Sequence, residues 1–438
     1  MNMSDIIAKK RDGNRLNGEE IKFFIKGVTN GGIPDYQASA LLMAIFIRGM
    51  DTEETACLTT AMMNSGEVMD FSAIPGIKAD KHSTGGVGDT VTLITAPLVA
   101  SLGVPVIKMS GRGLGFSGGT IDKLESIKGL SCSLTKARAI ENVRKIGFVI
   151  MEQTKGLVPA DKKLYALRDV TATVQSIPLI ASSIMSKKLA SGADAIVLDV
   201  KCGSGAFMKN EHEARKLAEE MIKTGEALGK KIVCVLSGMD EPLGLSIGNS
   251  LEVIEAFDVL KGDIKSGGLL DVSMEIGSHM LLLAGRAKNK EEAALMLKQN
   301  IENGRGLLKL KELIELQGGN PNVAEDYSLM PVSGKRLCAV SEKAGYVFAI
   351  DTELIGRASV ETGAGRAEKG DAIDPGAGIV MKARLGDYVE KGAPLAKIYS
   401  STRERCKSAE KLLKSAVFIG DEKPSPKKLI IDVIGKAV

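Results

Sequence analysis

The stretch AIVLDVKCGSGAF, residues 195–207, is an apolar, β-branched run that ends in a glycine turn. The segment that follows, ARKLAEEMIKTGEAL (214–228), repeats its apolar residues at helical spacing. The same order of strand, glycine loop and helix recurs after VPVIKM (104–109) and after KIVCVL (231–236). Strands that alternate with helices predict a mostly parallel central sheet covered by helices on both faces. Ligands of such sheets bind at the carboxyl ends of the strands.

The N-terminal part of the chain follows a different pattern. Residues 1–65 are predicted to be helical, because the apolar residues within 41–46 recur at helical spacing. Asp51 and Glu54 have the spacing of a capping box, which predicts the start of a helix that stops at Gly66. This part is therefore expected to form a separate helical unit.

Two further segments complete the predicted organisation. Residues 160–193 are mostly helical in pattern, and we expect them to return to the first helical unit. Residues 345–400 hold many glycines and short turn-bounded runs such as GYVFAI, which is typical of a compact β-rich module. The fold class is therefore α/β with a separate small all-α domain and a C-terminal β-rich (α+β) module. The predicted boundaries are 1–65 plus 160–193 for the helical domain, 70–159 plus 194–330 for the α/β domain, and 331–438 for the module, packed on the α/β domain.

Composition excludes several classes of protein. A net charge of +4 over 438 residues is too small for a dedicated nucleic-acid binder, and no basic run alternates with aromatics. The N-terminus lacks the pattern of a signal peptide, and no stretch approaches the roughly 20 apolar residues of a membrane span. The closest cysteines, Cys202 and Cys234, are 32 residues apart, which excludes C-x-x-C redox or zinc motifs. We expect a cytoplasmic protein with reduced thiols, no organic cofactor, and neither a membrane nor a nucleic-acid polymer as partner.

Two glycine turns carry the residues of a possible anion site. KHSTGGVGDT (81–90) is not a phosphate-binding P-loop of the Walker type, because its lysine precedes the glycines. Glycines 113, 115 and 118 match G-x-G-x-x-G, but the acid at the right distance, Glu141, lies in a helical pattern, which argues against a nicotinamide site. The alternatives are a solvated structural turn or two loops, 83–92 and 110–120, that face one anion. The candidate anion ligands are Lys81, Ser83, Thr92, Ser110 and Thr120.

Other polar residues could bind a planar heterocycle. His82 is either structural or a general acid or hydrogen-bonding group, because it adjoins the glycine loop. Within 160–193, an aromatic ring, a guanidinium, hydroxyls and an ammonium recur at i, i+3 and i, i+4 spacing. Each alone is typical of a solvated helix face, but together they could stack on and hydrogen-bond a ring rich in carbonyls. These residues are Tyr165, Arg168, Ser183, Ser186 and Lys187.

Four segments resemble one known family. SGRGLGFSGGTIDKLESI (110–127) closely resembles the signature of the thymidine and pyrimidine-nucleoside phosphorylases. KHSTGGVGDTVT (81–92), DVKCGSGAFM (199–208) and IGNSLEVIEA (247–256) are also similar to family segments, in order and at family length. One departure is Phe116-Ser117, where the family has His-Thr, and it affects local loop packing. The resemblance implies phosphorolysis of pyrimidine nucleosides to free base and α-pentose 1-phosphate, by a homodimer whose two-part subunits close on the substrates.

The resemblance also implies roles for individual residues. It places phosphate against Lys81, Ser83, Thr92, Lys108, Ser110 and Thr120. It places the base against Tyr165, Arg168, Ser183 and Lys187, with His82 near its O2 edge. His82, Arg168 and Lys187 are then the candidate catalytic groups, because they can stabilise the negative charge of the departing base. It further implies one potassium ion per subunit, held by Gly88, Thr90, Leu243, Ser246 and Glu255.

Three alternatives to this function are considered. A strict thymidine phosphorylase is one, and Lys108 argues against it, because deoxyribose-specific members of the family resembled here tend to carry Met at this position. A phosphoribosyltransferase of related fold is another, but the loops lack an acidic pair for magnesium. The third is a biotinyl or lipoyl carrier, since residues 378–398 resemble a carrier hairpin with Lys382 at its tip. An unmodified β-rich module is favoured by the context of the catalytic motifs.

Overall fold

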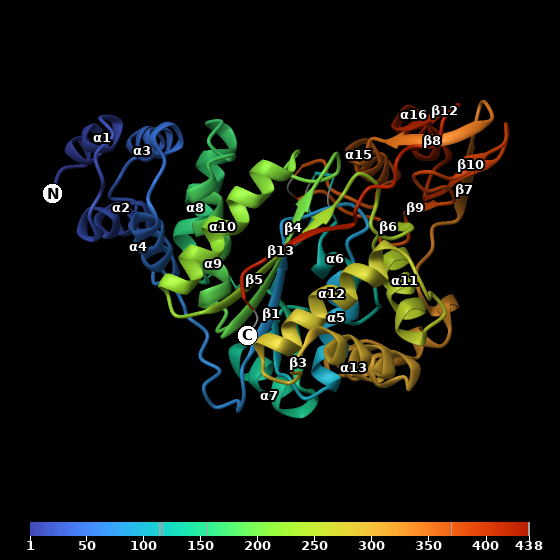
Figure 1. The fold of residues 1–438 in the computed structure, drawn as a ribbon, viewed down its shortest axis with the longest axis horizontal. Coiled ribbons are helices and arrows are strands. Elements are labelled where there is room, and N and C mark those ends of the chain that lie inside the picture. The colour runs from blue at the N-terminus through green and yellow to red at the C-terminus, as the bar shows by residue number, and fades with distance from the viewer. Residues whose placement is uncertain (114, 117, 155, 369, 437–438) are drawn as a thin grey trace.

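The computed structural model describes residues 1–113, 115–116, 118–154, 156–368 and 370–436. A helical unit lies at one end, a central sheet with its helices lies in the middle, and the C-terminal module lies at the other end (Figure 1). The predicted fold class is confirmed by this arrangement and by the largely parallel central sheet. Among the described residues, no helix is long and apolar enough to cross a lipid bilayer.

The N-terminal unit begins with helices that bury one apolar side each. The predicted capping box is present, because Asp51 accepts the Glu54 N–H at 2.8 Å and Glu54 accepts the Asp51 N–H at 3.0 Å. The capped helix ends at Met63, and Gly66 has another role: a Cβ there would lie 2.1 Å from the Gly156 carbonyl oxygen, so glycine permits two backbones to approach. The helices are α1 (Met3–Arg11), α2 (Gly18–Asn30), α3 (Asp35–Arg48) and α4 (Thr52–Met63).

Two helices from the middle of the chain pack against this unit, α8 (Pro159–Val170) and α9 (Ile177–Ala190). Leu164 of α8 and Leu179 of α9 share an apolar cluster with residues of α2 and α4. Another side of α9, including Ile184, packs on α10 (Glu211–Ala227) in a separate cluster. Helix α9 is therefore packed into both the helical and the α/β parts, and the exact domain boundaries stay a prediction.

The central sheet has the strand order β13-β5-β4-β1-β2-β3. Strands β1 to β5 are parallel, whereas β13 comes from the C-terminal end of the chain and pairs with β5 in the antiparallel sense. Residues of 331–438 therefore return to this sheet and cover its edge strand, which was not predicted from the sequence. The strands are β1 (Ala79–Ser83), β2 (Val106–Ser110), β3 (Phe148–Glu152), β4 (Ala195–Cys202), β5 (Lys231–Gly238) and β13 (Ile430–Ile434).

Helices cover both faces of this sheet, as the pattern of β4 predicts. All eight residues of β4 are buried, and its apolar residues alternate between two clusters: Val197 faces the layer of α5 and α12, whereas Ile196 and Leu198 face α9 and α10. The remaining helices of this part are α5 (Val91–Ser101), α6 (Thr120–Glu125), α7 (Lys136–Ile146), α11 (Ser250–Lys261), α12 (Gly268–Leu283), α13 (Lys290–Glu302) and α14 (Arg305–Leu316), followed by the 3₁₀ turns η1 (Pro321–Ala324) and η2 (Tyr327–Leu329).

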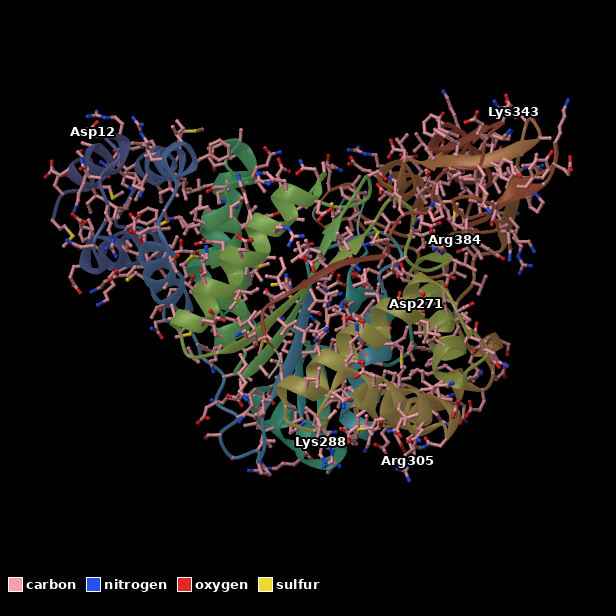
Figure 2. All side chains as sticks on the ribbon, in the orientation of Figure 1. Asp12, Asp271, Lys288, Arg305, Lys343 and Arg384 are labelled. Atoms are coloured by element: carbon pink, nitrogen blue, oxygen red, sulfur yellow. The ribbon has the colours of Figure 1, made fainter. Side chains whose placement is uncertain are left out.

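The C-terminal module consists of two small antiparallel sheets and two helices. One sheet has the order β10-β8-β12, and the other, β6-β9-β11-β7, takes its first strand from the α/β part of the chain. Arg384 lies where the module meets the α/β part (Figure 2), with its Nε 2.9 Å from Glu241 Oε2. Lys382 follows β9 directly and is exposed. The elements are β6 (Ser246–Gly248), β7 (Lys335–Val340), β8 (Gly345–Ile350), α15 (Thr352–Thr362), β9 (Gly378–Met381), β10 (Tyr388–Val389), β11 (Pro394–Ser400), α16 (Arg403–Ala416) and β12 (Val417–Gly420).

Candidate active site

The two glycine loops meet because β1 and β2 are parallel neighbours. The carboxyl ends of these strands lie at the same edge of the sheet, so the loops that follow them, 84–90 and the described residues of 111–119, flank one cavity of about 190 Å³. Larger hollows of about 710 and 800 Å³ exist elsewhere, but neither is lined by residues of these two loops. His82 lines the cavity, and so do all six residues assigned to phosphate, which are Lys81, Ser83, Thr92, Lys108, Ser110 and Thr120.

Two lysines in this cavity are almost completely buried. Lys108 is 5% exposed, and its Nζ donates to the Lys81 carbonyl oxygen at 2.8 Å. Burial, together with the Lys188 ammonium, holds the pKa of Lys108 well below its ordinary value. Burial also lowers the pKa of Lys81, although Asp89 and Asp199 act in the opposite direction. Buried cations with lowered pKa values are suited to an anion, which would favour their charged forms.

A buried polar network supports Lys81 from the neighbouring strand β4. Asp199 Oδ2 lies 2.8 Å from Lys201 Nζ and 3.9 Å from Lys81 Nζ, while Ser237 Oγ donates to Asp199 Oδ1 at 2.6 Å. Neither Asp199 nor Lys201 was predicted from the sequence to belong to the site. A signal was available, since they are two charged residues at i, i+2 within an otherwise apolar strand and must therefore face the same side.

His82 lies on β1 between the phosphate cavity and α9. Burial and then the positive charges of Lys188, Lys108, Lys187 and Lys81 hold its pKa well below the ordinary value for histidine. The side chain is therefore a neutral imidazole at neutral pH, able to donate one hydrogen bond and accept another.

The residues assigned to the base lie on α8 and α9 as the spacing predicted, but their contacts add two findings. Lys187 Nζ is 2.8 Å from Asp161 Oδ2 and 3.2 Å from Ser183 Oγ, so Asp161 is a partner that the sequence analysis missed. Arg168 is buried, and its guanidinium donates to three main-chain carbonyls, those of Thr173, Val174 and Leu179. It therefore holds the α8–α9 turn as well as being a candidate for the base.

The structure keeps the base group and the phosphate group apart. The described residues that line the 190 Å³ cavity include none of the residues of α8 and α9 that were assigned to the base. Tyr165 is 48% exposed, with the Arg168 guanidinium carbon 5.9 Å from its ring centre. The link between the groups is Lys188, which donates to Asp80 Oδ2 of β1 at 2.8 Å and to the Met109 carbonyl of β2 at 3.3 Å.

The residues that the resemblance assigned to potassium lie together behind the first glycine loop. Glu255 is buried and accepts the N–H groups of Leu245 and Ser246 at 2.7 and 2.8 Å. Burial raises its pKa, and no ion pair joins it to a basic side chain within the described ranges. The Gly88 carbonyl accepts the Gly244 N–H at 3.1 Å, which brings this loop against residues 243–246. A buried carboxylate of this kind fits a hard monovalent cation. The described residues hold no cluster of three or more His, Cys, Asp or Glu that could bind a metal ion.

Family models match the chain in three consecutive parts. Residues 4–66 match the helical bundle domain of a glycosyl transferase family, and residues 76–307 match the a/b domain of that family. Residues 346–420, which include the whole carrier-like hairpin, match the pyrimidine nucleoside phosphorylase C-terminal domain. The fold and the domain order are therefore those of a glycosyltransferase enzyme.

Curated relatives are similar over almost the entire chain. The pyrimidine-nucleoside phosphorylase of Bacillus subtilis is 51% identical over 427 residues, which cover 98% of each chain. That of Geobacillus stearothermophilus is 51% identical over 434 residues, 99% of this chain and 100% of the relative. The chain belongs to the pyrimidine-nucleoside phosphorylase family, as the resemblance predicted.

A solved structure of anthranilate phosphoribosyltransferase (TrpD) from Thermus thermophilus is also similar. It aligns with a TM-score of 0.58 and 20% identity, over 71% of this chain and 98% of that one. At this identity the similarity shows a shared fold alone. It explains why a phosphoribosyltransferase was an alternative on architecture, while the curated relatives favour the phosphorylase.

Proposed function

We propose that this protein catalyses the reversible phosphorolysis of pyrimidine nucleosides. Uridine, thymidine or deoxyuridine reacts with phosphate to give the free base and α-D-ribose or α-D-deoxyribose 1-phosphate. The observation that carries this proposal is the cavity between the two glycine loops, where Lys81 and Lys108 are buried beside hydroxyl donors. The names of the curated relatives support the same activity and the pyrimidine base.

In this reaction the C1′–N1 bond of the nucleoside breaks and its electron pair goes to the pyrimidine. Lys187 and Arg168 offset that negative charge, and the neutral His82 donates a hydrogen bond at O2. A phosphate oxygen bonds to C1′ from the opposite face of the sugar and offsets the positive charge that develops there. The departing base anion is protonated at N1, and the proton that hydrogen phosphate gives up on forming the ester balances this step.

The separation of the two groups of residues suggests a closing motion. Phosphate binds between the loops after β1 and β2, whereas the base binds on α8 and α9, so the units must approach for the reacting atoms to meet. The Lys188–Asp80 ion pair, at 2.8 Å, lies between the two groups and is placed to act as a pivot for this motion.

A potassium ion is proposed beside the first glycine loop. Gly88, Thr90, Leu243, Ser246 and Glu255 would hold it, through main-chain or side-chain oxygens. A bound ion would offset the buried charge of Glu255 and would rigidify the loop that follows Ser83. The Thr90 hydroxyl already donates to Glu252 Oε2 at 2.5 Å, which leaves its oxygen free to accept a cation.

A homodimer in the cytoplasm is the proposed state of the protein. Helix α3 exposes a row of apolar side chains on one side, of which Tyr36 and Ile47 are 75% and 69% exposed. Burial of such a row against a second copy is the simplest use for it. All six cysteines are free, which is consistent with a reducing compartment. Ile47→Glu is expected to give a monomer in sedimentation velocity, and a variant that stays dimeric would place the interface elsewhere.

Phosphate dependence tests the proposed function. Uridine and thymidine are each incubated with the protein, with and without phosphate, and free base is measured by chromatography. We expect release that saturates with phosphate and stops without it. Equal release in phosphate-free buffer would identify a hydrolase and reject the proposal. Turnover of thymidine but not uridine would identify the strict thymidine enzyme instead.

A further inference from the structure

The C-terminal module contacts the second glycine loop directly. The Gly115 N–H donates to the Arg366 carbonyl oxygen at 3.1 Å, and Arg366 Nη1 donates to the Gly113 carbonyl oxygen at 3.2 Å. Phe116, at the position where the sequence departs from its family, packs against the apolar cluster of the module. Ser117, the other residue of that departure, lies outside the described residues. Helix α15 approaches closely, since a Cβ at Gly356 would lie 2.5 Å from the Phe116 carbonyl oxygen.

Arg366 also forms a two-point ion pair with the helix that follows this loop. Its Nη1 and Nη2 lie 2.8 and 2.9 Å from the two carboxylate oxygens of Asp122. Asp122 is buried on α6, two residues after Thr120, and its Oδ2 also accepts the Gly113 N–H at 2.7 Å. One carboxylate thus joins the middle of the loop to the start of the helix, and Arg366 holds that carboxylate.

Other contacts of Asp122 cannot replace this pair. Arg112 Nη1 is 3.4 Å from Asp122 Oδ1, but its shorter contacts go to Glu125 at 2.7 Å and to Glu152 at 2.9 Å. Without Arg366, Asp122 would keep one distant cation and one main-chain donor. A two-point arginine–carboxylate pair fixes orientation as well as distance, which a single contact does not.

The segment that carries Arg366 is itself fixed to the rest of the molecule. The Asn249 side chain, at the N-terminus of α11, donates to the Ala364 carbonyl oxygen at 2.8 Å. Gly363 ends α15 in the left-handed conformation, with a φ of 100°, and the Ser400 hydroxyl of β11 donates to the preceding Thr362 carbonyl at 2.6 Å. Arg366 therefore extends from a well-supported turn.

We infer that Arg366 is a positioning residue for phosphate binding, through which the C-terminal module holds Ser110 and Thr120 in place. The loop 111–119 connects these two residues, and Arg366 contacts both the loop and α6 without lining the phosphate cavity. The module thereby acquires a role in the reaction that its distance from the base site does not suggest. This inference rests on the proposed function for the identity of the anion.

Arg366→Ala and Arg366→Lys test the inference, with Arg357→Ala as the control. Arg357 is exposed in the same module, and among the described residues its ion pair is with Glu353 on its own helix. We expect Arg366→Ala to raise the KM for phosphate at least tenfold while kcat and the KM for the nucleoside change less than threefold. Arg366→Lys, which keeps the charge and most of the stem, is expected to recover part of the loss, and Arg357→Ala to resemble the wild type.

Phosphate binding measured by titration calorimetry separates this inference from the proposed function. If the wild type binds phosphate but releases no base, the proposed phosphorolysis is rejected. The Kd of each variant for phosphate can still be compared with that of the wild type in that case. Arg366 is not a positioning residue if both of its variants keep the wild-type affinity for phosphate. The same conclusion follows if kcat falls and both KM values rise to a similar extent in these variants. It also follows if Arg366→Lys binds phosphate as weakly as Arg366→Ala while its circular dichroism spectrum is unchanged.

Discussion

Lys108→Met is the substitution that most directly tests how the sugar is recognised. Methionine has a similar length and volume but no donor, so it fills the same buried space beside β1. It removes the hydrogen bond from Nζ to the Lys81 carbonyl, and it also removes a positive charge adjacent to Lys188. Because that charge is already disfavoured by burial, we expect the variant to fold with little or no loss of stability.

The expected size of the effect follows from one unpaired hydroxyl. The proposed role of Lys108 is to satisfy the 2′-hydroxyl of ribose, which deoxyribose lacks. A buried polar group left without a partner costs about 1–3 kcal/mol. Since about 1.4 kcal/mol corresponds to a factor of ten, the ratio of kcat/KM for the ribonucleoside to that for the deoxyribonucleoside should fall by about 5- to 150-fold. Both efficiencies should also fall together, because a proposed phosphate ligand is lost.

Uridine and 2′-deoxyuridine are the right pair for the assay, because they share the base and differ only at the 2′ position. Lys81→Met is the matched control: it removes the other buried lysine of the phosphate cavity, and it should lower both efficiencies without changing their ratio. The reasoning is refuted if the wild type does not use uridine. It is equally refuted if Lys108→Met leaves the ratio within twofold of the wild type, or if Lys81→Met shifts the ratio as much.

Three further predictions concern His82, Asp199 and Arg168. The imidazole resonance of His82, assigned with His82→Asn, should not titrate between pH 6 and 8 without phosphate, because burial and the surrounding lysines disfavour the imidazolium. Saturating phosphate should move its pKa upward, and a midpoint at or above about 6.5 without phosphate would contradict the neutral form. Asp199→Asn removes a carboxylate that favours the charged form of Lys81, so the loss of kcat/KM for phosphate at alkaline pH should begin at a lower pH than in the wild type. If the loss of kcat/KM at alkaline pH begins at the same pH as in the wild type, Asp199 does not act through Lys81. Arg168→Ala should lower kcat/KM at least tenfold and also lower the free energy of unfolding in urea by about 2 kcal/mol or more, because three carbonyls lose their donor. An unchanged urea midpoint would show that the α8–α9 turn does not depend on this side chain.

The amino-acid sequence by itself determined the fold class and the meeting of the two glycine loops at one cavity, where phosphate binding is proposed. Apolar runs such as 195–200 followed by glycine turns and helical periods are local signals, and local signals can be read without coordinates. The meeting of the loops after 83 and 110 also followed from the sequence, because neighbouring parallel strands end at the same edge of their sheet. The capping box of α4 is local in the same sense.

Only the tertiary structure decided which side chains support those loops. Asp122 and Arg366 are 244 residues apart, and Lys81 and Asp199 come from different strands. Neither contact therefore produces a local pattern in the sequence from which it could be predicted. The return of β13 to the central sheet is equally non-local. The three carbonyl contacts of Arg168 could not be predicted for another reason. Every residue has a main-chain carbonyl, so the residue type does not show which carbonyl accepts a hydrogen bond. Residue identity and local period are written in the sequence, whereas the partners of a buried charge depend on how distant segments pack.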